Sequence, residues 1–279
     1  MDLTAILVAT PCGLIAGGFV TMLVDRVPDK TPLTLASRCP HCEHALGPVD
    51  TIPVVSWLLR RGTCRHCAEP ITPAYPVVEL VTAALFVLVA IEHGLEWLAL
   101  PPAILVVALV ALSTIDMYVY RLPDRLVFPA LAGSAVAMVG VAFAIDRAEA
   151  LPKAAAGAVG YFLLLFIAHV ISPRGMGFGD VKLALLLGLH LGWTAGSTYV
   201  GWSPVIRLVF YALLIGCVIG VAVGLFVAVL RRGGHDVAPD PEADDAEQPA
   251  RLLQNSFPFG PALAAATMLL VLYPDLAVG

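Results

Sequence analysis

The stretch WLALPPAILVVALVALSTID, residues 97–116, is apolar over almost its whole length, and its only charged side chain is the last one, Asp116. A helix needs about 20 mainly apolar residues to cross the hydrocarbon core of a bilayer. The stretch therefore predicts a transmembrane helix that ends in an acid. An ionisable group at a membrane boundary is energetically costly, which makes Asp116 a candidate functional residue.

The rest of the chain has a similar composition. Hydrophobic residues make up 59% of its 279 residues and charged residues only 13%, which excludes a soluble domain of this length. We predict an all-α polytopic membrane protein with about eight transmembrane helices. The segment 1–24 begins with Asp2 rather than a basic cluster, so we take it as a membrane helix and not a signal peptide. The expected helices cover residues 4–24, 75–92, 97–116, 126–145, 153–171, 181–199, 205–230 and 257–277.

Two polar segments interrupt the apolar pattern, and neither can span a bilayer. Residues 25–74 follow the first helix and are expected to form a small separate domain. Residues 231–256 lie within the helical region 75–279 and carry a run of acids. They are rich in Ala, Pro and acids with few large apolar residues, so we expect a loosely held loop there.

The basic residues predict the orientation of the chain. If residues 25–74 are cytoplasmic, thirteen of the sixteen Lys and Arg residues fall on the cytoplasmic side, and only Arg147, Lys153 and Arg207 fall outside. Loops rich in Lys and Arg remain in the cytoplasm. Both acids, Asp116 and Asp180, are therefore expected to face the cytoplasm, as is the 25–74 domain, while both termini lie outside.

Four cysteines in the 25–74 domain have the spacing of a zinc site. They form two Cys-x-x-Cys pairs, Cys39 with Cys42 and Cys64 with Cys67. Such pairs present two sulfurs in one direction, and two pairs give tetrahedral coordination. Two disulfides are the alternative, which a reducing cytoplasm disfavours. His41 and His66 could replace a sulfur ligand, whereas Cys12 and Cys217 lie in predicted helices and are expected to pack there.

A second acid follows three alternating glycines in GMGFGD, residues 175–180. Asp180 could simply cap the helix that follows, and Asp124 has the same interpretation at the start of its own helix. Asp116 is different, because a negative charge is unfavourable at a helix carboxyl end. The glycines would permit unusual backbone angles and the approach of an extended peptide. Two neighbouring carboxylates share a proton, and one acid and one base are what an aspartic peptidase needs.

These motifs together resemble the type IV prepilin peptidase family, membrane aspartic peptidases with a Gly-x-Gly-Asp signature. The resemblance extends over most of the chain. It rests on the two cysteine pairs, on Ile115-Asp116 followed by Leu122-Pro123-Asp124, and on Gly175 to Leu183. It also rests on Asp50-Thr51-Ile52-Pro53, Ser56-Trp57, Arg61 to Cys64, Tyr75 to Leu80 and Phe257 to Pro261.

The resemblance implies an enzyme of the bacterial inner membrane that removes the leader from type IV prepilins or from the pseudopilins of type II secretion. Asp116 and Asp180 would be catalytic at the cytoplasmic face, within an active-site loop containing Gly175, Gly177, Gly179 and Lys182. Members with the cysteine domain also methylate the new terminal amine with S-adenosylmethionine. The implied cofactors are structural zinc and this methyl donor, and the implied partners are pilin substrates and the bilayer, with no nucleic acid.

The chain departs from the family pattern in its first helix, where Gly17-Gly18-Phe19-Val20-Thr21 is followed by Arg26-Val27-Pro28, and at Thr51. Because both aspartates are present, these changes concern methyl transfer and substrate recognition more than proteolysis. A peptidase without methyltransferase activity is therefore one alternative. A membrane transporter or assembly scaffold with a zinc-stapled loop is a remote one.

Overall fold

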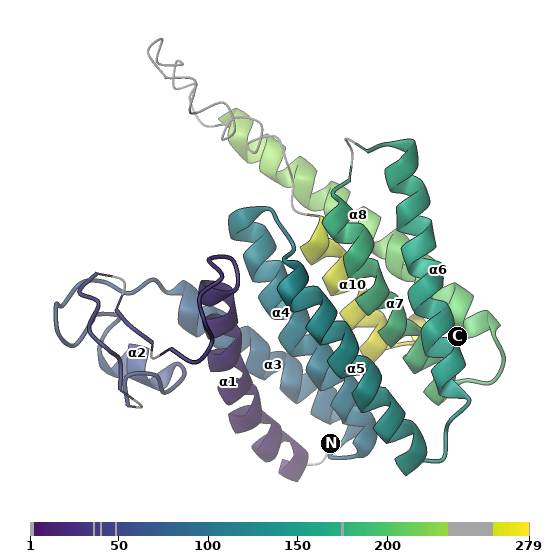
Figure 1. Cartoon of the computed structure of the whole chain (residues 1–279), viewed down its shortest axis with the longest axis horizontal. Coiled ribbons are helices and arrows are strands. Elements are labelled where there is room, and N and C mark those ends of the chain that lie inside the picture. The colour runs from purple at the N-terminus through teal and green to yellow at the C-terminus, as the bar shows by residue number, and fades with distance from the viewer. Residues whose placement is uncertain are drawn as a thin grey trace.

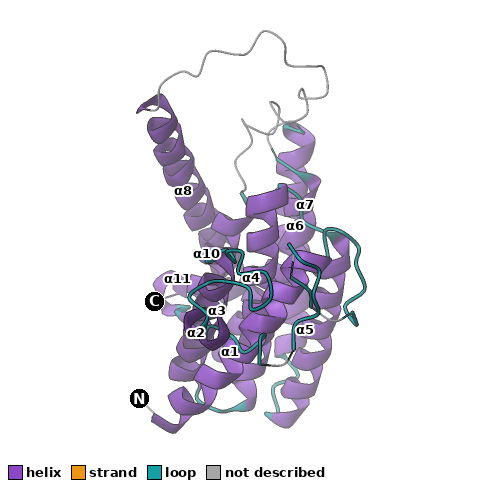
Figure 2. Ribbon diagram, turned by 90° about the vertical axis from the view of Figure 1, so that its left-hand side faces the viewer, coloured by secondary structure: helices purple, strands orange, loops and turns teal. Residues whose placement is uncertain are grey.

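The computed structural model describes residues 3–35, 37–39, 41–47, 49–173, 176–233 and 259–278. Helices run side by side in one bundle, and a small lobe with little regular structure projects beside α1 and α3 (Figures 1 and 2). No β-strand occurs in the described ranges, only two isolated bridges inside the lobe. The helices are α1 (Leu3–Arg26), α2 (Val55–Leu59), α3 (Ala74–His93), the 3-10 helix η1 (Trp97–Ala99), α4 (Leu100–Val119), α5 (Asp124–Ala144), α6 (Ala150–Ile171), α7 (Phe178–Thr198), α8 (Ser203–Gly233), α10 (Gly260–Leu272) and α11 (Asp275–Val278).

The all-helical prediction is confirmed, and a helix lies in each of the eight expected ranges. Within the described ranges, six helices are both long and apolar enough to cross a bilayer, namely α1, α3, η1 with α4, α5, α6 and α8. The seventh, α7, is long but less apolar, and α10 has only 13 residues. Of the acidic loop expected at 231–256, the first three residues belong to α8, which ends at Gly233, and residues 234–256 lie outside the described part of the chain.

Helix α7 is less apolar because protein surrounds it. Fifteen of its residues are buried, including Thr194 and the glycines Gly188, Gly192 and Gly196. A helix enclosed by other helices does not need an apolar side chain at every position, since lipid does not reach it. Its His190 is buried and its Nε2 lies 2.9 Å from the Ser134 hydroxyl on α5. The low hydropathy of α7 therefore marks the centre of the bundle.

Helices α6 and α7 pack backbone against backbone. A Cβ at Gly192 would lie 2.2 Å from the carbonyl oxygen of Lys153, and one at Gly188 would lie 2.2 Å from that of Gly157. Glycines spaced by four residues along one helix allow this close approach in membrane bundles. The spacing Gly188, Gly192, Gly196 is visible in the sequence, so this close packing is a feature that the sequence could have predicted.

We expect Gly192→Ala to destabilise the protein, because the added methyl group overlaps backbone atoms that cannot rotate away. Overpacking of this kind costs about 1–3 kcal/mol. Gly160→Ala is the matched control, since its Cβ on α6 would meet no atom within 4 Å. It should be neutral or stabilising by up to about 1 kcal/mol. Thermal unfolding in detergent measures both, and equal melting temperatures would contradict the packing described.

Candidate active site and metal centre

Asp116 and Asp180 come from α4 and α7 and approach each other beside Gly260, the first residue of α10. Both acids are buried, with 6% and 9% of their surface exposed. The N–H of Gly260 donates to Asp116. A Cβ at Gly260 would lie 2.8 Å from Oδ2 of Asp116 and 3.6 Å from Oδ1 of Asp180. The two carboxylates therefore border one small space, and only a glycine fits there.

The position of Asp116 at the end of α4 is now understandable. A carboxylate there opposes the negative end of the α4 dipole, but it meets the first N–H of α10, where the dipole is positive. A negative charge at this helix end was expected to be unfavourable, and the N–H of Gly260 compensates it. Gly260 lies within the Phe257 to Pro261 motif, for which the sequence predicted no role.

The helix-cap interpretations of Asp180 and Asp124 are both wrong. The residue that precedes α7 is Gly177 and the one that precedes α5 is Pro123, and neither helix start has a side-chain cap. Asp180 lies within the first turn of α7 and points to the other carboxylate. Asp124 instead forms an ion pair with Lys182, whose Nζ is 2.7 Å from Oδ1. That ion pair joins the start of α5 to α7.

Of the two described glycines before Asp180, neither has special backbone angles, and Gly179 is closely packed. Gly177 has φ −67° and ψ 141°, which any residue adopts, and Gly179 is not in the left-handed region either. A Cβ at Gly179 would lie 3.2 Å from the Cβ of Leu122. The predicted unusual angles are thus absent at these two positions, while Gly175 lies outside the described residues.

A cavity of about 600 Å³ opens at the acid pair. Asp116, Asp180, Gly177, Gly179 and Lys182 all line it. Its remaining wall is formed by the connection between α4 and α5 and by the residues just after α1. We call it the third cavity. It places two buried acids at the edge of a space large enough for a peptide segment, since ligand pockets commonly measure about 300–1,000 Å³.

The four cysteines of the lobe gather around one point. Their sulfurs all lie within 4.8 Å of one another, with 3.9 Å between Cys39 and Cys67 and 4.0 Å between Cys42 and Cys64. Four sulfurs at 2.3 Å from a tetrahedral zinc ion are about 3.8 Å apart. The N–H groups of Cys67 and His66 lower the pKa of the Cys64 thiol, while burial and the neighbouring sulfurs raise that of Cys67. A bound metal ion would favour the thiolate form of all four.

The two cysteine pairs sit in matching turns twenty-five residues apart. The N–H of Cys39 donates to the backbone carbonyl of His44, and the N–H of Glu43 donates back to the carbonyl of Cys39. In the second turn the N–H of Cys64 donates to the backbone carbonyl of Glu69, and the N–H of Ala68 donates back to the carbonyl of Cys64. Short antiparallel bridges close both turns, Arg38 with Ala45 and Thr63 with Pro70. Each turn directs two sulfurs at the partner turn. A closed set of four protein ligands fits a structural zinc ion.

We expect one zinc ion per chain and its loss in Cys64→Ser, because three thiolates leave the tetrahedron incomplete. Cys12→Ser is the matched control, since Cys12 lies on α1 outside the cluster. Elemental mass spectrometry of purified protein gives the metal content, and limited proteolysis tests whether the lobe unfolds. Full zinc content in Cys64→Ser, or equal loss in both variants, would contradict the assignment.

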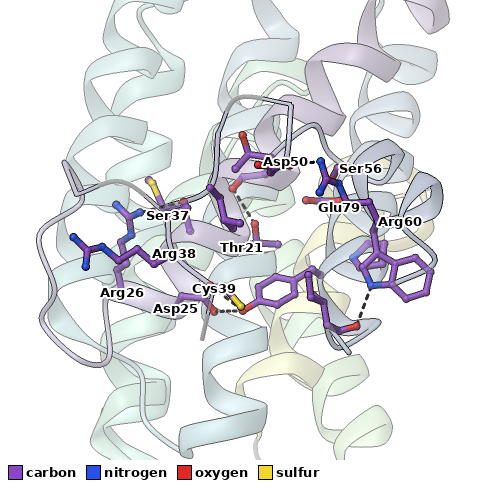
Figure 3. Close-up of a pocket in the computed structure, with 18 of the residues that line it drawn as sticks. Thr21, Asp25, Arg26, Ser37, Arg38, Cys39, Asp50, Ser56, Arg60 and Glu79 are labelled. Carbon is purple, nitrogen blue, oxygen red and sulfur yellow. Dashed lines mark hydrogen bonds and ion pairs between the residues drawn. The ribbon is translucent and has the colours of Figure 1, made fainter. Parts of the chain in front are cut away.

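Another large cavity lies between the lobe and the helices α1 and α3 (Figure 3). We call it the first cavity, and it measures about 430 Å³. Arg60 and Asp50 form an ion pair on its lobe side, and the Gly47 N–H together with Arg60 lowers the pKa of Asp50. Its other residues include Thr21, Asp25, Arg26, Ser37, Arg38, Cys39, Ser56, Trp57, Tyr75 and Glu79.

Glu79 connects the lobe to the bundle at the base of this cavity. It is buried on α3 and accepts a hydrogen bond of 2.6 Å from the N–H of Val54. Val54 has φ 60°, an angle that a β-branched residue adopts only when its surroundings impose it. Arg26 makes the second connection, since its guanidinium donates to the Leu33 carbonyl and to Ser37.

Comparison with known proteins gives two family models and a set of similar relatives. Residues 12–93 match the model of the bacterial peptidase A24 N-terminal domain, and residues 103–225 match that of the type IV leader peptidase family. A prepilin leader peptidase/N-methyltransferase of Aeromonas hydrophila is 34% identical over 255 residues, covering 90% of this chain and 77% of that relative. The chain belongs to the type IV leader peptidase family.

Other relatives in the type IV leader peptidase family carry the same name. One from Burkholderia pseudomallei (strain K96243) is 35% identical over 76% of this chain and 73% of its own length. Another, from Bacillus subtilis (strain 168), is 29% identical over 94% of this chain and 92% of its own. No solved structure matches significantly. The family and the six apolar helices make this a multi-pass bacterial inner membrane protein.

The two family models divide the molecule as the two sites do. The N-terminal match covers α1 from residue 12 onward, the cysteine lobe and α3, and so contains the first cavity. The leader peptidase match contains Asp116 and Asp180. Three residues had no predicted role: Gly260 beside the acids, which lies outside both matches, and Glu79 with Val54 beneath the lobe, which lie within the N-terminal match. Gly260 could have been found, because it precedes Pro261 at the start of a predicted helix.

Proposed function

We propose that the chain is an aspartic endopeptidase that cuts the leader from prepilins or pseudopilins and then methylates the new terminal amine. The proposal is carried by the meeting of Asp116 and Asp180 at Gly260, inside a cavity, in a member of the leader peptidase family. The relatives' printed name supports both activities. The positive-inside bias supports an active site that faces the cytoplasm.

The acid pair supplies one base and one acid. Two carboxylates this close do not both ionise, so they share one proton. One aspartate takes a proton from water as the water attacks the peptide carbonyl, and the other protonates the carbonyl oxygen. Collapse of the tetrahedral intermediate releases the leader and the mature pilin. The pair acts as a unit, so neither role belongs to one residue alone.

Methyl transfer is assigned to the first cavity. S-adenosylmethionine, when bound, supplies an electrophilic methyl group, and the cavity of about 430 Å³ has the size of a small-molecule site with both aromatic and charged walls. Trp57 lies in its wall, held by a hydrogen bond from its indole N–H to the Ile71 carbonyl at 3.1 Å. The zinc ion would be bound by Cys39, Cys42, Cys64 and Cys67 and would fix the lobe that forms half of this wall.

The test uses purified protein in detergent with a prepilin and S-adenosylmethionine that carries a deuterated methyl group. Mass spectrometry of the product terminus distinguishes the outcomes. Cleavage with a labelled methyl group is expected. Cleavage without methyl transfer would leave a peptidase with a structural zinc lobe, and no cleavage of several pilins would favour a transporter or scaffold.

A further inference from the structure

Three cavities follow one another from the acid pair to the lobe. The second cavity measures about 410 Å³ and lies between the carboxyl ends of α1 and α4 and the start of α3. It shares Pro28 and Val119 with the third cavity. It shares Thr21, Asp25 and Tyr75 with the first cavity. Neither catalytic aspartate and no cysteine of the lobe lines the second cavity, yet it shares wall residues with both of the other cavities.

Asp25 stands where the first and second cavities meet. Its carboxylate accepts hydrogen bonds from the Tyr75 hydroxyl, at 3.2 Å and 3.1 Å from its two oxygens (Figure 3). In the described part of the chain the only ion pairs are Arg60 with Asp50 and Lys182 with Asp124. The neighbouring Arg26 is directed to Leu33 and Ser37 instead. Asp25 is therefore a negative charge at this junction without a cation bound to it.

We infer that the three cavities form one passage, along which the newly cut pilin terminus moves from the acid pair to the methyl donor, and that Asp25 binds its ammonium group there. This inference rests on the proposed function. The charge that must move is positive, since cleavage leaves a free α-amino group at the pilin terminus. A carboxylate with no bound cation is the complementary group, and hydrogen bonds to charged groups are among the strongest in proteins.

The chemistry at this point is balanced without a further reagent. An α-amino group has a pKa of about 7.7–8.0, so its ammonium form readily loses a proton to water near neutral pH. The nitrogen lone pair then forms a bond to the methyl carbon of the sulfonium donor. The carbon–sulfur bond breaks, its electrons remain on sulfur, and the donor becomes a neutral thioether. The terminal nitrogen is left as an N-methylammonium group beside Asp25.

The first test is Asp25→Asn, which keeps the shape of the side chain and removes its charge. A pilin cut beforehand, with a free terminal amine, is given as substrate. We expect kcat/KM for its methylation to fall about 10- to 100-fold, the worth of a hydrogen bond to a charged group. Cleavage of intact prepilin should be unchanged, because Asp25 does not line the third cavity. The Kd of S-adenosylhomocysteine, the donor product, is measured alongside by equilibrium dialysis.

The control is Asp29→Asn, which removes an exposed acid that lines the second cavity but not the first. It should change kcat/KM for methylation by less than about threefold, well below the fall of at least about tenfold expected for Asp25→Asn. Asp25→Glu should recover part of the rate, because it restores the carboxylate. Normal methylation by Asp25→Asn would overturn the assignment of Asp25. So would a parallel loss of S-adenosylhomocysteine binding or of cleavage, which would indicate a structural role.

The passage itself is tested at Ala74, which lies at the start of α3 and lines only the second of the three cavities. Ala74→Trp should fill that cavity, so that prepilin is cut at the normal rate while unmethylated product accumulates. Ala74→Ser leaves it open and should behave as the unmodified protein. Equal methylation by both variants would overturn the passage. If the unmodified protein cuts but never methylates, the proposed methyltransferase activity fails first, and this inference fails with it.

Discussion

Asp116→Asn and Asp180→Asn should each lower prepilin cleavage by about 1,000-fold or more. An amide cannot share a proton between acid and base roles, and general acid–base catalysis contributes about 10²–10⁴-fold in enzymes. The two effects should not multiply in the double variant, since the carboxylates act on one water as a unit. Cleavage is measured by gel shift of a prepilin with purified variants.

The charge change at Asp124 provides the comparison for these variants. Asp124→Asn also removes a carboxylate from the wall of the third cavity, but it breaks only the half-exposed ion pair with Lys182. Exposed ion pairs contribute about 0–1 kcal/mol, so its cleavage rate should change less than about fivefold. A loss at Asp124 equal to that at Asp116 would mean that the third cavity depends on charge rather than on the acid pair.

Gly260→Ala should lower cleavage about 100-fold even though it removes no catalytic group. The new methyl carbon would lie 2.8 Å from Oδ2 of Asp116, so the carboxylate must move, and a displacement of about 1 Å at a reaction centre can cost 10²-fold. Gly133→Ala is the control, because its Cβ on α5 meets no atom within 4 Å. Both variants are compared by cleavage rate and by thermal unfolding.

The outcome at Gly260 separates two explanations. Normal unfolding with lost cleavage is expected if the glycine exists to leave space for the acids. Normal cleavage in Gly260→Ala would show that Asp116 can rotate away without losing its role, which would contradict a reaction at this position. A large loss of stability would instead assign Gly260 to helix packing.

The sequence predicted the members of the acid pair but not what brings them together. Asp116 was recognisable because a helix carboxyl end is unfavourable for a negative charge. Asp180 was recognisable because three alternating glycines precede it. Their meeting depends on α10, more than eighty residues after α7 begins, and hydrophobic patterns do not specify which helices are neighbours. The cysteine cluster was predictable in full, because ligand spacing within each pair determines the turn.

The errors concern features that depend on neighbours. Asp124 and Asp180 both begin helices, so a cap was the reasonable local interpretation, yet Lys182 and Asp116 on other elements decide where these carboxylates lie. Helix α7 has modest hydropathy because the bundle encloses it. The angle at Val54 follows from Glu79, twenty-five residues away, so no local pattern could indicate it.

The glycine contacts between α6 and α7 also determine how the acid pair is free to move. Asp180 belongs to a helix pair whose backbones touch, so this pair should move as one rigid body. Asp116 belongs to α4, which meets α7 at few points and packs instead against α5, α10, α1 and α3. A shift of these two bodies against each other would therefore change the gap between the two carboxylates. Opening and closing around a peptide would then be a sliding motion between bodies, with α10 and its Gly260 in contact with both α4 and α7.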